Sequence, residues 1–379
     1  MSFLRTGIIL ALSVIACMAG AEPEPAKKTA PPPPPVFAQV KDTAELLDAV
    51  SRIGWQGGTI SLLPGTYEIK DSIVIKSSNT YLIGSGWNTL IKKIGDGDAI
   101  VFSGSLWCCG VKNLVVEGDP NAKTGSGIVF KDGEWCGICV IDYCYLRSFP
   151  ESGLKFDGNL KAPFSSNTVS NCWFQGNKGD QLSSRNNNDW YIIGNQFGSG
   201  GEGARSGALL ENSSAGTYTM NYHWGNRVGV RMLGGNFNRI ENNRIEQSRE
   251  SGLVIGDPKP GTWNAYNIIT GNTIHTNSET NSGKFPAVVA YDAHETTFCT
   301  NQIMSWDTNS VRHKNGIVLE RCKNWIIKDN IFRHHSEKAM VLNKKKDGHI
   351  IKDNIMDKDV KPKKAEKPKK VEKAVETEE

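Results

Sequence analysis

Short apolar strands recur along the middle of the chain in one repeated pattern. A Gly or Ala opens a strand whose residues alternate in polarity, and after a turn an apolar pair precedes an Asn and another apolar residue. The clearest copy spans residues 316–319 and 325–332. Other copies open at Ala99, Gly127, Gly153, Gly207, Gly229, Gly252, Ala287 and Ala339, and a degenerate copy lies at 179–182. Successive copies are 22 to 35 residues apart, and a supersecondary unit repeated at that period predicts a solenoid.

The repeated segments are three to six residues long, which is too short for helices and typical of strands. The second half of the pattern carries an Asn at the same place in successive copies. These residues are Asn195, Asn243, Asn272, Asn301, Asn330 and Asn354. Asn suits a tight corner because it tolerates the left-handed backbone conformation, and its amide can bond to the Asn of the next coil. The alternative, ordinary turn asparagines in a β-sandwich, is disfavoured by ten copies in phase.

These residues resemble the right-handed parallel β-helix of the pectate-lyase-like superfamily, over residues 37–357. Residues 43–50 read as a short amphipathic helix able to cap the open end of a β-helix, and residues 57–67 resemble the family's first coil. The resemblance implies an all-β, right-handed, single-stranded parallel β-helix of about ten coils, with three strands in each coil. It also implies an asparagine ladder between the second and third strands and a substrate groove on the first sheet. These are fold-level signals and do not name a reaction.

Both ends differ in composition from the repeats. Residues 1–21 combine Arg5, an apolar run and small residues, which is typical of a secretory signal peptide. Two processing sites remain open, an A-x-A site ending at Ala21 and a lipobox-like sequence that would leave Cys17 lipidated. Residues 22–36 form a Pro-rich linker, and the Lys/Glu-rich tail 358–379 is expected to be disordered. We therefore expect export, either to the extracellular space or to a lipid anchor in the bacterial cell envelope.

The net charge of +4 is not gathered into a basic stripe interleaved with aromatic residues, so nucleic-acid binding is not expected. A mildly basic groove would suit an acidic polysaccharide. No cofactor and no metal are expected, because no C-x-x-C pair has matching His ligands and no cluster of Asp marks a calcium site. No segment after the signal is apolar over enough length to span a membrane. The repeats make one domain, which we expect to be monomeric.

Eight cysteines follow the signal peptide. The repeat register places Cys109 level with Cys139, and Cys144 level with Cys172. Neighbouring strands lie about 4.8 Å apart, which is within the Cα range of a disulfide, and export favours oxidation. A stacked ladder of reduced thiols fits the same register, because Cys packs as a small hydrophobe. Both states remain open, and the poor disulfide geometry of stacked side chains favours the reduced ladder.

Side chains alternate in and out along a strand, so the register predicts which residues face outward on the first sheet. Later coils present mostly Val, whereas coils two to six present charged and polar residues. These residues are Lys131, Lys155, Asp157, Gln181, Glu211 and Arg231. Opposite charges on adjacent strands can simply stabilise a solvated sheet face. The functional interpretation is that an acid, a base and cations meet on one patch.

Asp157, Glu211, Lys155 and Arg231 are the candidate catalytic residues. The two carboxylates stand two coils apart, which puts their Cα atoms about 9–10 Å apart from the strand spacing. That separation is compatible with inverting hydrolysis of a glycosidic bond, in which a water fits between the carboxyls. A polysaccharide lyase would instead use Lys155 or Arg231 as the base, with a partner cation on the uronate carboxylate.

Further residues are candidates for binding the substrate. They are Lys131, Gln181, Arg185, His223, Trp224 and Tyr291. Exposed aromatic rings can stack on sugars, and His223 with Trp224 precedes the Arg231 strand and is expected to overhang the charged patch. Trp190, Tyr222, Trp263 and Trp306 also lie in or beside connecting segments, where packing over the end of a coil is the competing role. Residues 291–295 resemble the Asp-Pro-His signature of β-helical alginate epimerases without its proline, which makes the His294 region a second candidate site.

The catalytic motifs of characterised relatives are missing. Neither W-x-D-H and R-x-P-x-x-R of pectate lyases nor N-T-D and G-H-G of polygalacturonases occur. We expect an exported polysaccharide-acting protein that cleaves a glycan, as a glycoside hydrolase or polysaccharide lyase, in a groove on the first sheet. The alternative is a non-catalytic surface protein that binds carbohydrate or serves as a rigid rod. An enzyme should show a cleft walled by loops where the four candidate catalytic residues converge, and a rod should show them apart and solvated.

Overall fold

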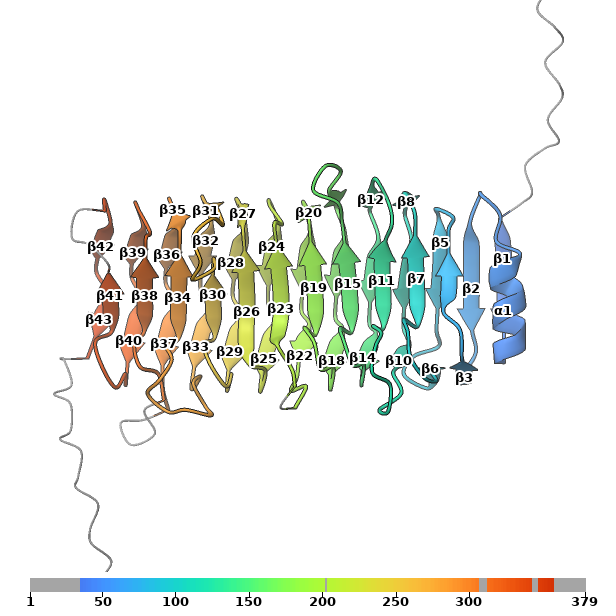
Figure 1. The fold of residues 1–379 in the computed structure, drawn as a ribbon, viewed down its shortest axis with the longest axis horizontal. Helices are drawn as coiled ribbons and strands as arrows, with labels where there is room; N and C mark the ends of the chain where they lie inside the picture. The colour runs from blue at the N-terminus through green and yellow to red at the C-terminus, as the bar shows by residue number, and fades with distance from the viewer. Residues whose placement is uncertain (1–34, 202, 307–311, 343–346, 358–379) are drawn as a thin grey trace, which may run out of the picture. The chain divides into compact units, whose positions relative to one another are not determined.

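The computed structural model describes residues 35–201, 203–306, 312–342 and 347–357. Within these residues the chain winds into a stack of coils whose strands belong to three long parallel sheets (Figure 1). Each strand pairs with the corresponding strand of the next coil, as β11 pairs with β15, so sequence-distant segments lie side by side. We number the sheets so that the asparagine corner lies between the second and the third.

Among the described residues the first sheet has 11 strands: β4 (Ile73–Ile75), β7 (Ile100–Ser103), β11 (Ile128–Lys131), β15 (Leu154–Asp157), β19 (Leu182–Arg185), β23 (Ser206–Glu211), β26 (Val228–Leu233), β30 (Leu253–Ile255), β34 (Val288–Tyr291), β38 (Ile317–Glu320) and β41 (Met340–Leu342). The second sheet has 13 in the same part of the chain: β1 (Val36–Val40), β2 (Gly58–Leu62), β5 (Thr80–Ile83), β9 (Gly110–Lys112), β13 (Val140–Asp142), β17 (Thr168–Ser170), β21 (Tyr191–Ile193), β24 (Thr217–Thr219), β28 (Arg239–Glu241), β32 (Ile268–Thr270), β36 (Thr297–Cys299), β39 (Ile326–Lys328) and β42 (Ile350–Lys352).

The third sheet has 12 strands in the described ranges: β3 (Gly65–Ile69), β6 (Thr89–Lys93), β10 (Val115–Glu117), β14 (Tyr145–Arg147), β18 (Trp173–Gln175), β22 (Gln196–Phe197), β25 (Tyr222–Trp224), β29 (Arg244–Glu246), β33 (Thr273–His275), β37 (Gln302–Met304), β40 (Ile331–Arg333) and β43 (Ile355–Met356). Two short sheets lie between the first and second: β8 (Leu106–Trp107), β12 (Cys136–Gly137), β16 (Phe164–Ser165) and β20 (Asn187–Asn188), then β27 (Gly235–Asn236), β31 (Asn264–Ala265) and β35 (Ala293–His294). The predicted all-β parallel β-helix of about ten coils is confirmed, with 11 first-sheet strands in the described residues.

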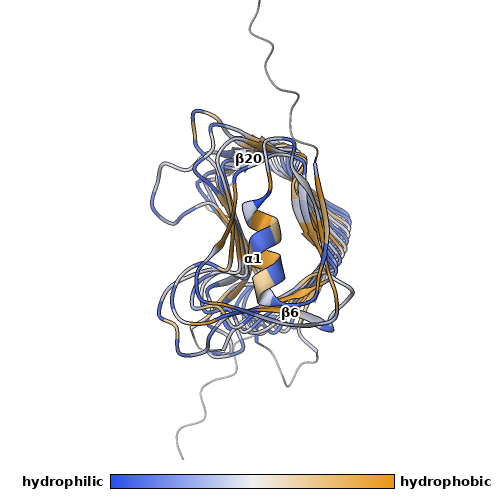
Figure 2. Cartoon of the chain, turned by 90° about the vertical axis from the view of Figure 1, so that its right-hand side faces the viewer, coloured by the Kyte–Doolittle hydropathy of each residue, from blue (hydrophilic) through white to orange (hydrophobic). Residues whose placement is uncertain are grey.

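A single helix, α1 (Thr43–Ser51), occurs in the part of the chain that the structure describes. It begins at an Asp42 cap, whose side chain accepts a hydrogen bond of 2.9 Å from the N–H of Glu45. Leu46 and Ala49 on its apolar face are buried. Figure 2 shows the helix lying across the end of the coil stack, so the predicted capping helix is confirmed. It covers apolar core that would otherwise face water at the first coil.

The core is a column of inward-facing residues, one layer for each coil. In the first sheet Phe130 stacks between Phe102 and Phe156, with ring centroids 4.4 and 4.8 Å apart. All three rings are at most 1% exposed. Identical residues recur at the same inward position because parallel in-register strands place each side chain directly above its counterpart. The same alternation turns the intervening residues outward, which is how the fold presents a regular outer face to ligands.

An asparagine ladder runs along the corner between the second and third sheets. Its members are Asn195, Asn221, Asn243, Asn272, Asn301, Asn330 and Asn354. From Asn221 onward, each Oδ1 accepts hydrogen bonds from the backbone N–H and the side-chain amide of the Asn one coil earlier. From Asn243 to Asn272 these bonds are 3.0 and 2.9 Å long. The predicted column is confirmed, and Asn221 fills the place between Asn195 and Asn243. The ladder Asn was expected to adopt the left-handed backbone conformation itself. Instead, the residue before it adopts this conformation, as Asn242 does with a φ of 57°.

The predicted outward columns of the first sheet are confirmed for the regular coils. Val129 pairs with Lys155 and Leu209 with Arg231, so these residues occupy one outward column. A second column, two residues further along each strand, contains Asp157, which lies opposite Arg185, which in turn lies opposite Glu211. The prediction that Asp157 and Glu211 stand two coils apart is therefore correct.

The degenerate coil departs from the predicted register. Its outward residues are Ser183 and Arg185, which lie level with the outward pair of the preceding coil. Gln181, predicted to face outward, is fully buried at the position where other coils have Gly or Ala. Its Oε1 accepts a hydrogen bond of 2.7 Å from Asn177, so the larger polar side chain is satisfied inside the corner. The prediction of Gln181 as a substrate-binding residue is therefore wrong in its placement.

The predicted segments 1–21, 22–36 and 358–379 fall almost wholly outside the described residues, as does Cys17. Within the described residues no helix is both long and apolar enough to span a membrane. Pairing of Val140 with Gly110 sets Cys139 level with Cys109, as predicted. All eight cysteines after the signal are present as free thiols.

Candidate functional site

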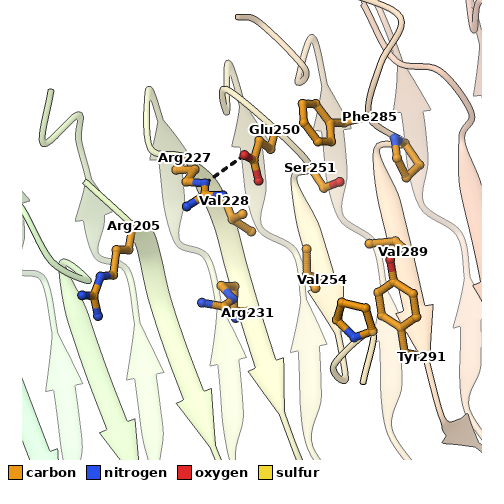
Figure 3. Close-up of a pocket in the computed structure, with 12 residues that line it drawn as sticks. Arg205, Arg227, Val228, Arg231, Glu250, Ser251, Val254, Phe285, Val289 and Tyr291 are labelled. Atoms are coloured by element: carbon orange, nitrogen blue, oxygen red, sulfur yellow. Dashed lines mark hydrogen bonds and ion pairs between the residues drawn. The ribbon is translucent and has the colours of Figure 1, made fainter. Parts of the chain in front are cut away.

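A cavity of about 490 Å³ lies on the outward face of the first sheet, over strands β26, β30 and β34 (Figure 3). Outward residues of these strands form its floor, and the segments that lead into them form its sides. The lining residues are Arg205, Arg227, Val228, Arg231, Glu250, Ser251, Val254, Pro258, Phe285, Pro286, Val289 and Tyr291. The cavity therefore combines three arginines and one carboxylate with apolar and aromatic walls.

Three of the charged residues that line the cavity occupy the same position in three successive coils. Arg205, Arg227 and Glu250 each stand two residues before the Gly that opens a coil. The N–H of Val228 bonds to the carbonyl of Arg205 at 3.0 Å, and the N–H of Glu250 bonds to the carbonyl of Arg227 at 2.8 Å. These backbone bonds stack the three positions at the edge of consecutive coils, and the rigid coil fixes their spacing.

The arginines of the cavity differ in how their charge is balanced. The Nε of Arg227 lies 2.8 Å from Oε1 of Glu250, as Figure 3 shows. Arg205 and Arg231 have no ion pair or side-chain hydrogen bond with any residue that the structure describes, and both side chains line the cavity. Two cations in a concave site that form no ion pair with the residues described favour the binding of an anionic group.

Asp180 is a buried carboxyl close to these two arginines. Its Oδ1 accepts a hydrogen bond of 3.2 Å from the N–H of Ser206. Burial raises the pKa of the Asp180 carboxyl, while the hydrogen bonds from Ser206 and the positive charges of Arg231 and Arg205 act in the opposite direction. A perturbed carboxyl beside a cavity is typical of functional sites.

Tyr291 forms one wall of the cavity, and Arg321 holds it there. The Arg321 guanidinium lies 5.7 Å from the centroid of the Tyr291 ring and pairs with Asp292 at 2.9 Å. The same guanidinium donates to the carbonyls of Asp257 and Pro258 at 3.3 and 3.1 Å, which fixes the loop that closes this side. Burial is the main cause that raises the pKa of the Tyr291 hydroxyl, so it stays protonated at neutral pH.

The sequence matches a family described as the right handed beta helix region, over residues 126–303 and 206–361. Together these matches span more than half of the chain. The chain belongs to this family of right-handed β-helix proteins. The expected resemblance in fold is thereby confirmed, including the hand of the coil. No sequence among the curated proteins matches this β-helix protein.

Solved structures that resemble this β-helix protein include three enzymes. The mannuronan C-5 epimerase A-module of Azotobacter vinelandii has a TM-score of 0.66 at 16% identity, over 83% of this chain and 91% of that one. The DFA-IIIase of Arthrobacter chlorophenolicus has a TM-score of 0.59 at 14% identity, over 84% and 90%. The alginate lyase of a Paenibacillus species has a TM-score of 0.56 at 13% identity, over 71% and 95%. This likeness shows that the four proteins share a fold. The three structural neighbours are carbohydrate-acting enzymes.

Of the predicted catalytic residues, only Arg231 lines the cavity. Lys155 lies in the same outward column, three coils away, and pairs with Glu151 at 3.0 Å. Glu211 pairs with Arg185 at 2.8 Å. The structure therefore does not bring the four residues into one patch, although all of them face outward on the first sheet of this β-helix protein.

The other predicted first-sheet residues flank the cavity or lie away from it. Tyr291 belongs to its wall. Arg185 stands between Asp157 and Glu211 in the second outward column, so the two carboxyls do not face one shared water position. Asp157 is exposed, and Lys131 pairs with Asp98 at 3.2 Å. This row of alternating charges continues the outward face of the first sheet toward the N-terminal coils.

His223 and Trp224 do not overhang the charged patch as predicted. They belong to β25 of the third sheet, where strict alternation turns His223 inward and Trp224 outward. His223 is fully buried, stacks on Phe197 with ring centroids 4.6 Å apart and lies 2.5 Å from the hydroxyl of Tyr218. The prediction of both residues as ligands of the first-sheet groove is therefore wrong, because they lie in the core and on a different face.

Acidification is expected to destabilise the protein through His223. Burial lowers its pKa to about 3 in the folded protein, against about 6.5 in the unfolded chain. Below pH 6.5 the unfolded chain therefore binds a proton that the folded protein excludes, and stability falls by up to about 1.4 kcal/mol per pH unit until pH 3. Thermal unfolding from pH 8 to pH 4 measures the slope. In His223→Phe the slope should be shallower, and an unchanged slope would contradict the assignment.

The second candidate region, around His294, is structurally distinct from the cavity. His294 lies on β35, and its ring packs on Trp263 with centroids 4.7 Å apart. Burial and the nearby charge of Lys323 lower the pKa of the imidazole. Asp292 of the same segment is paired with Arg321, so this segment supplies the tether of Tyr291. In the described part of the chain, no group of three or more His, Cys, Asp or Glu is arranged to hold a metal ion.

The sequence interpretation missed Arg205, Arg227, Glu250 and Asp180. A signal for them was present, because the first three stand two residues before Gly207, Gly229 and Gly252, the openings of three consecutive coils. The same repeat that places the outward strand residues also places this column at the edge of the sheet.

Proposed function

We propose that this β-helix protein binds an acidic polysaccharide in the first-sheet cavity and cleaves it by β-elimination. The observation that carries the proposal is the presence of Arg205 and Arg231 in the cavity without an ion pair to any described residue, the one carboxylate of the lining being paired with Arg227. A guanidinium group pairs with a carboxylate through two parallel hydrogen bonds, so a uronate is the sugar that best fits two such groups.

The walls of the cavity support a sugar as the ligand. Phe285 and Tyr291 offer ring faces, and Ser251 offers a polar edge. Such a mixture of apolar surface and a few polar groups is typical of small-molecule sites. Two of the structural neighbours, the mannuronan epimerase and the alginate lyase, are named for acidic polysaccharides, which supports the same substrate class.

Elimination needs a neutralised carboxylate, a base and an acid. Arg205 and Arg231 would neutralise the uronate carboxylate, which makes the C5 proton more acidic. Glu250, held in place by its ion pair with Arg227, would take that proton. The C4–O bond then breaks and a C4–C5 double bond forms. Tyr291 would give its proton to the leaving oxygen, and proton return from Glu250 through solvent restores both groups. Figure 3 shows Glu250 and Tyr291 on different sides of the cavity.

Hydrolysis fits the cavity less well, because it calls for two carboxyl groups on either side of the scissile bond. The lining described here contains one carboxylate, Glu250, and it is paired with Arg227. We propose that Lys131, Lys155, Asp157, Arg185 and Glu211 contact neighbouring sugars of the same chain, since their coils continue the outward face beyond the cavity. Such flanking contacts would set the register of the polymer.

We also propose that the protein works outside the cytoplasm. The support comes from the signal-like residues 1–21 and the Pro-rich linker 22–36. Processing after Ala21 would release a soluble protein, and lipidation of Cys17 would leave it anchored in the envelope. The mass of the mature N-terminus distinguishes the two forms.

Removing the two unpaired arginines is expected to weaken the binding of acidic polysaccharide. Arg205→Ala and Arg231→Ala should each lower affinity for polygalacturonate or alginate about tenfold, the low end for a charge-assisted hydrogen bond at a partly exposed site. Titration calorimetry at low ionic strength measures the change. Arg239→Ala removes an equivalent charge from the second sheet and should leave affinity unchanged.

Several outcomes separate the alternatives. Unchanged affinity in both cavity variants would contradict the proposed site. Binding that depends on the arginines, without new reducing ends or unsaturated product, would instead support the non-catalytic carbohydrate-binding function. New reducing ends without absorbance of an unsaturated uronide would favour hydrolysis over elimination.

A further inference from the structure

Aromatic side chains form a row on the outward face of the third sheet. Tyr145, Trp173 and Trp224 occupy outward positions of β14, β18 and β25, and Trp87 reaches over from the segment before β6. Ring centroids of Trp87 and Tyr145 are 5.3 Å apart, those of Tyr145 and Trp173 are 5.8 Å apart, and those of Trp173 and Trp224 are 6.0 Å apart. Trp87 is 49% exposed. The row crosses several coils and belongs to a different face from the first-sheet cavity.

The row ends in a matching arrangement on each side. At one end Arg147 lies 5.0 Å over the ring of Tyr145 and donates to Glu117 at 2.6 Å. At the other end Arg244 lies 5.0 Å over the ring of Tyr222 and donates to Glu246 at 2.8 Å. The Tyr222 ring in turn packs 4.8 Å from Trp224. Each terminal tyrosine is thus held between an aromatic neighbour and an arginine whose charge is already paired.

Glu246 fixes its end of the row. It is only 4% exposed, accepts the hydroxyl of Tyr222 and lies 2.5 Å from Nε2 of His275. Trp306 packs edge-on against His275 with centroids 5.1 Å apart. Burial and the bond to Glu246 raise the pKa of Tyr222 to about 12, so its hydroxyl remains a donor. A buried, fully engaged carboxylate of this kind holds the rings in one geometry before any ligand arrives.

Both ends of the row open into hollows. A cavity of about 380 Å³ is lined by Tyr145, Arg147 and Gln175 among others. A second of about 340 Å³ is lined by Arg244, Thr273, His275, Met304, Ser305 and Trp306. The third sheet therefore carries a track in which flat aromatic faces alternate with polar side chains and terminate in concave sites.

We propose that this track is a second carbohydrate-binding surface, which takes a neutral polysaccharide lying along the coil stack. Sugar rings present apolar C–H faces to aromatic rings and hydroxyls to polar side chains at their edges, which is the alternation seen here. The arginines are paired with Glu117 and Glu246, so the track has no unbalanced cation for a carboxylate. The ligand class therefore differs from that of the first-sheet cavity, and the inference does not depend on it.

A carbohydrate-binding track gives a role to the aromatic row and to the two hollows at its ends, neither of which takes part in the function proposed for the first sheet. Stacking on aromatic rings tolerates different sugars, so such a surface suits anchoring of the protein on a matrix more than selection of one bond. Aromatic and Arg side chains are also enriched in protein–protein interfaces, and a second copy of this chain is the competing occupant. The two occupants differ in what they do to the oligomeric state.

The test compares the full mature chain with the double variant Trp173→Ala/Trp224→Ala. Dextran, xylan and galactomannan serve as neutral probes, and alginate as the acidic one, in affinity electrophoresis and tryptophan fluorescence titrations. At least one neutral polysaccharide should bind the wild type, and the double variant should bind it about tenfold more weakly, as expected for the loss of two stacking partners. Phe237→Ala/Tyr266→Ala removes a stacked pair exposed elsewhere, with centroids 5.1 Å apart, and should bind like the wild type.

Trp87→Ala is a milder variant, because this ring is exposed on a connecting segment, and it should weaken the same interaction without changing the unfolding temperature. Failure of every neutral probe to bind the wild type overturns the proposal. So does equal binding by the track variants and the wild type. Light scattering completes the test, since a wild-type dimer that becomes monomeric in Trp173→Ala/Trp224→Ala would assign the track to self-association instead.

Discussion

Replacing Glu250 by Gln or Tyr291 by Phe is expected to lower the turnover of an acidic polysaccharide about 10²–10⁴-fold, the usual contribution of a positioned base or acid. Gln cannot take a proton from C5, and Phe cannot give one to the leaving oxygen. Both replacements keep the shape of the side chain. Release of unsaturated uronide, followed by its ultraviolet absorbance, measures the rate.

The matched controls lie away from the cavity, with Glu241 on the second sheet and Tyr266 between β31 and β32. Glu241→Gln removes a carboxylate that is similarly half-buried and paired, with Arg239 at 3.6 Å, and Tyr266→Phe removes an exposed hydroxyl. Both controls should keep wild-type turnover, and all four variants should unfold at nearly the same temperature. Full activity of Glu250→Gln together with loss in Asp157→Asn or Glu211→Gln would move the chemistry to the coils that precede the cavity.

The sequence predicted the fold well because a β-helix repeats its constraints. Every coil must turn an apolar residue inward at the same position, so Leu154 and Ile317 occupy one inward column although they are far apart in the chain. The asparagine corner was equally predictable, since the side chain of Asn272 bonds to an Asn at the same position in the coil before it and in the coil after it. The predicted direction of a side chain was wrong where a coil departs from the repeated pattern. Gln181, for example, occupies a position where other coils have Gly or Ala.

The candidate site was less predictable, because cavities form where coils are irregular. The connecting segments that carry Phe285 and Pro258 differ in length from coil to coil, and repeat periodicity gives no position for them. Arg231 and Tyr291 were found because they lie on strands. The prediction for His223 was wrong because this residue was assigned to a connecting segment. It is the middle residue of the three-residue strand β25, and the alternation of side chains along that strand turns its ring into the core.

Removal of one ladder side chain by Asn272→Ala is expected to lower the free energy of unfolding by about 2–4 kcal/mol, since a buried donor left unpaired costs about 1–3 kcal/mol and several bonds are lost together. Its Oδ1 accepts two bonds from Asn243, and its amide donates to Ile240 at 2.8 Å and to Asn301 at 2.9 Å. Guanidinium unfolding followed by circular dichroism measures the change.

The control for the ladder is Asn281→Ala, which shortens an exposed side chain in a connecting segment and should change stability by less than about 0.5 kcal/mol. A solenoid is held together by contacts between neighbouring coils, so a defect in the middle of the ladder also weakens the link between the coils that carry the first-sheet cavity. Asn272→Ala should therefore show earlier loss of polysaccharide binding with denaturant than the wild type. Equal unfolding midpoints for Asn272→Ala and Asn281→Ala would show that backbone pairing alone holds this corner.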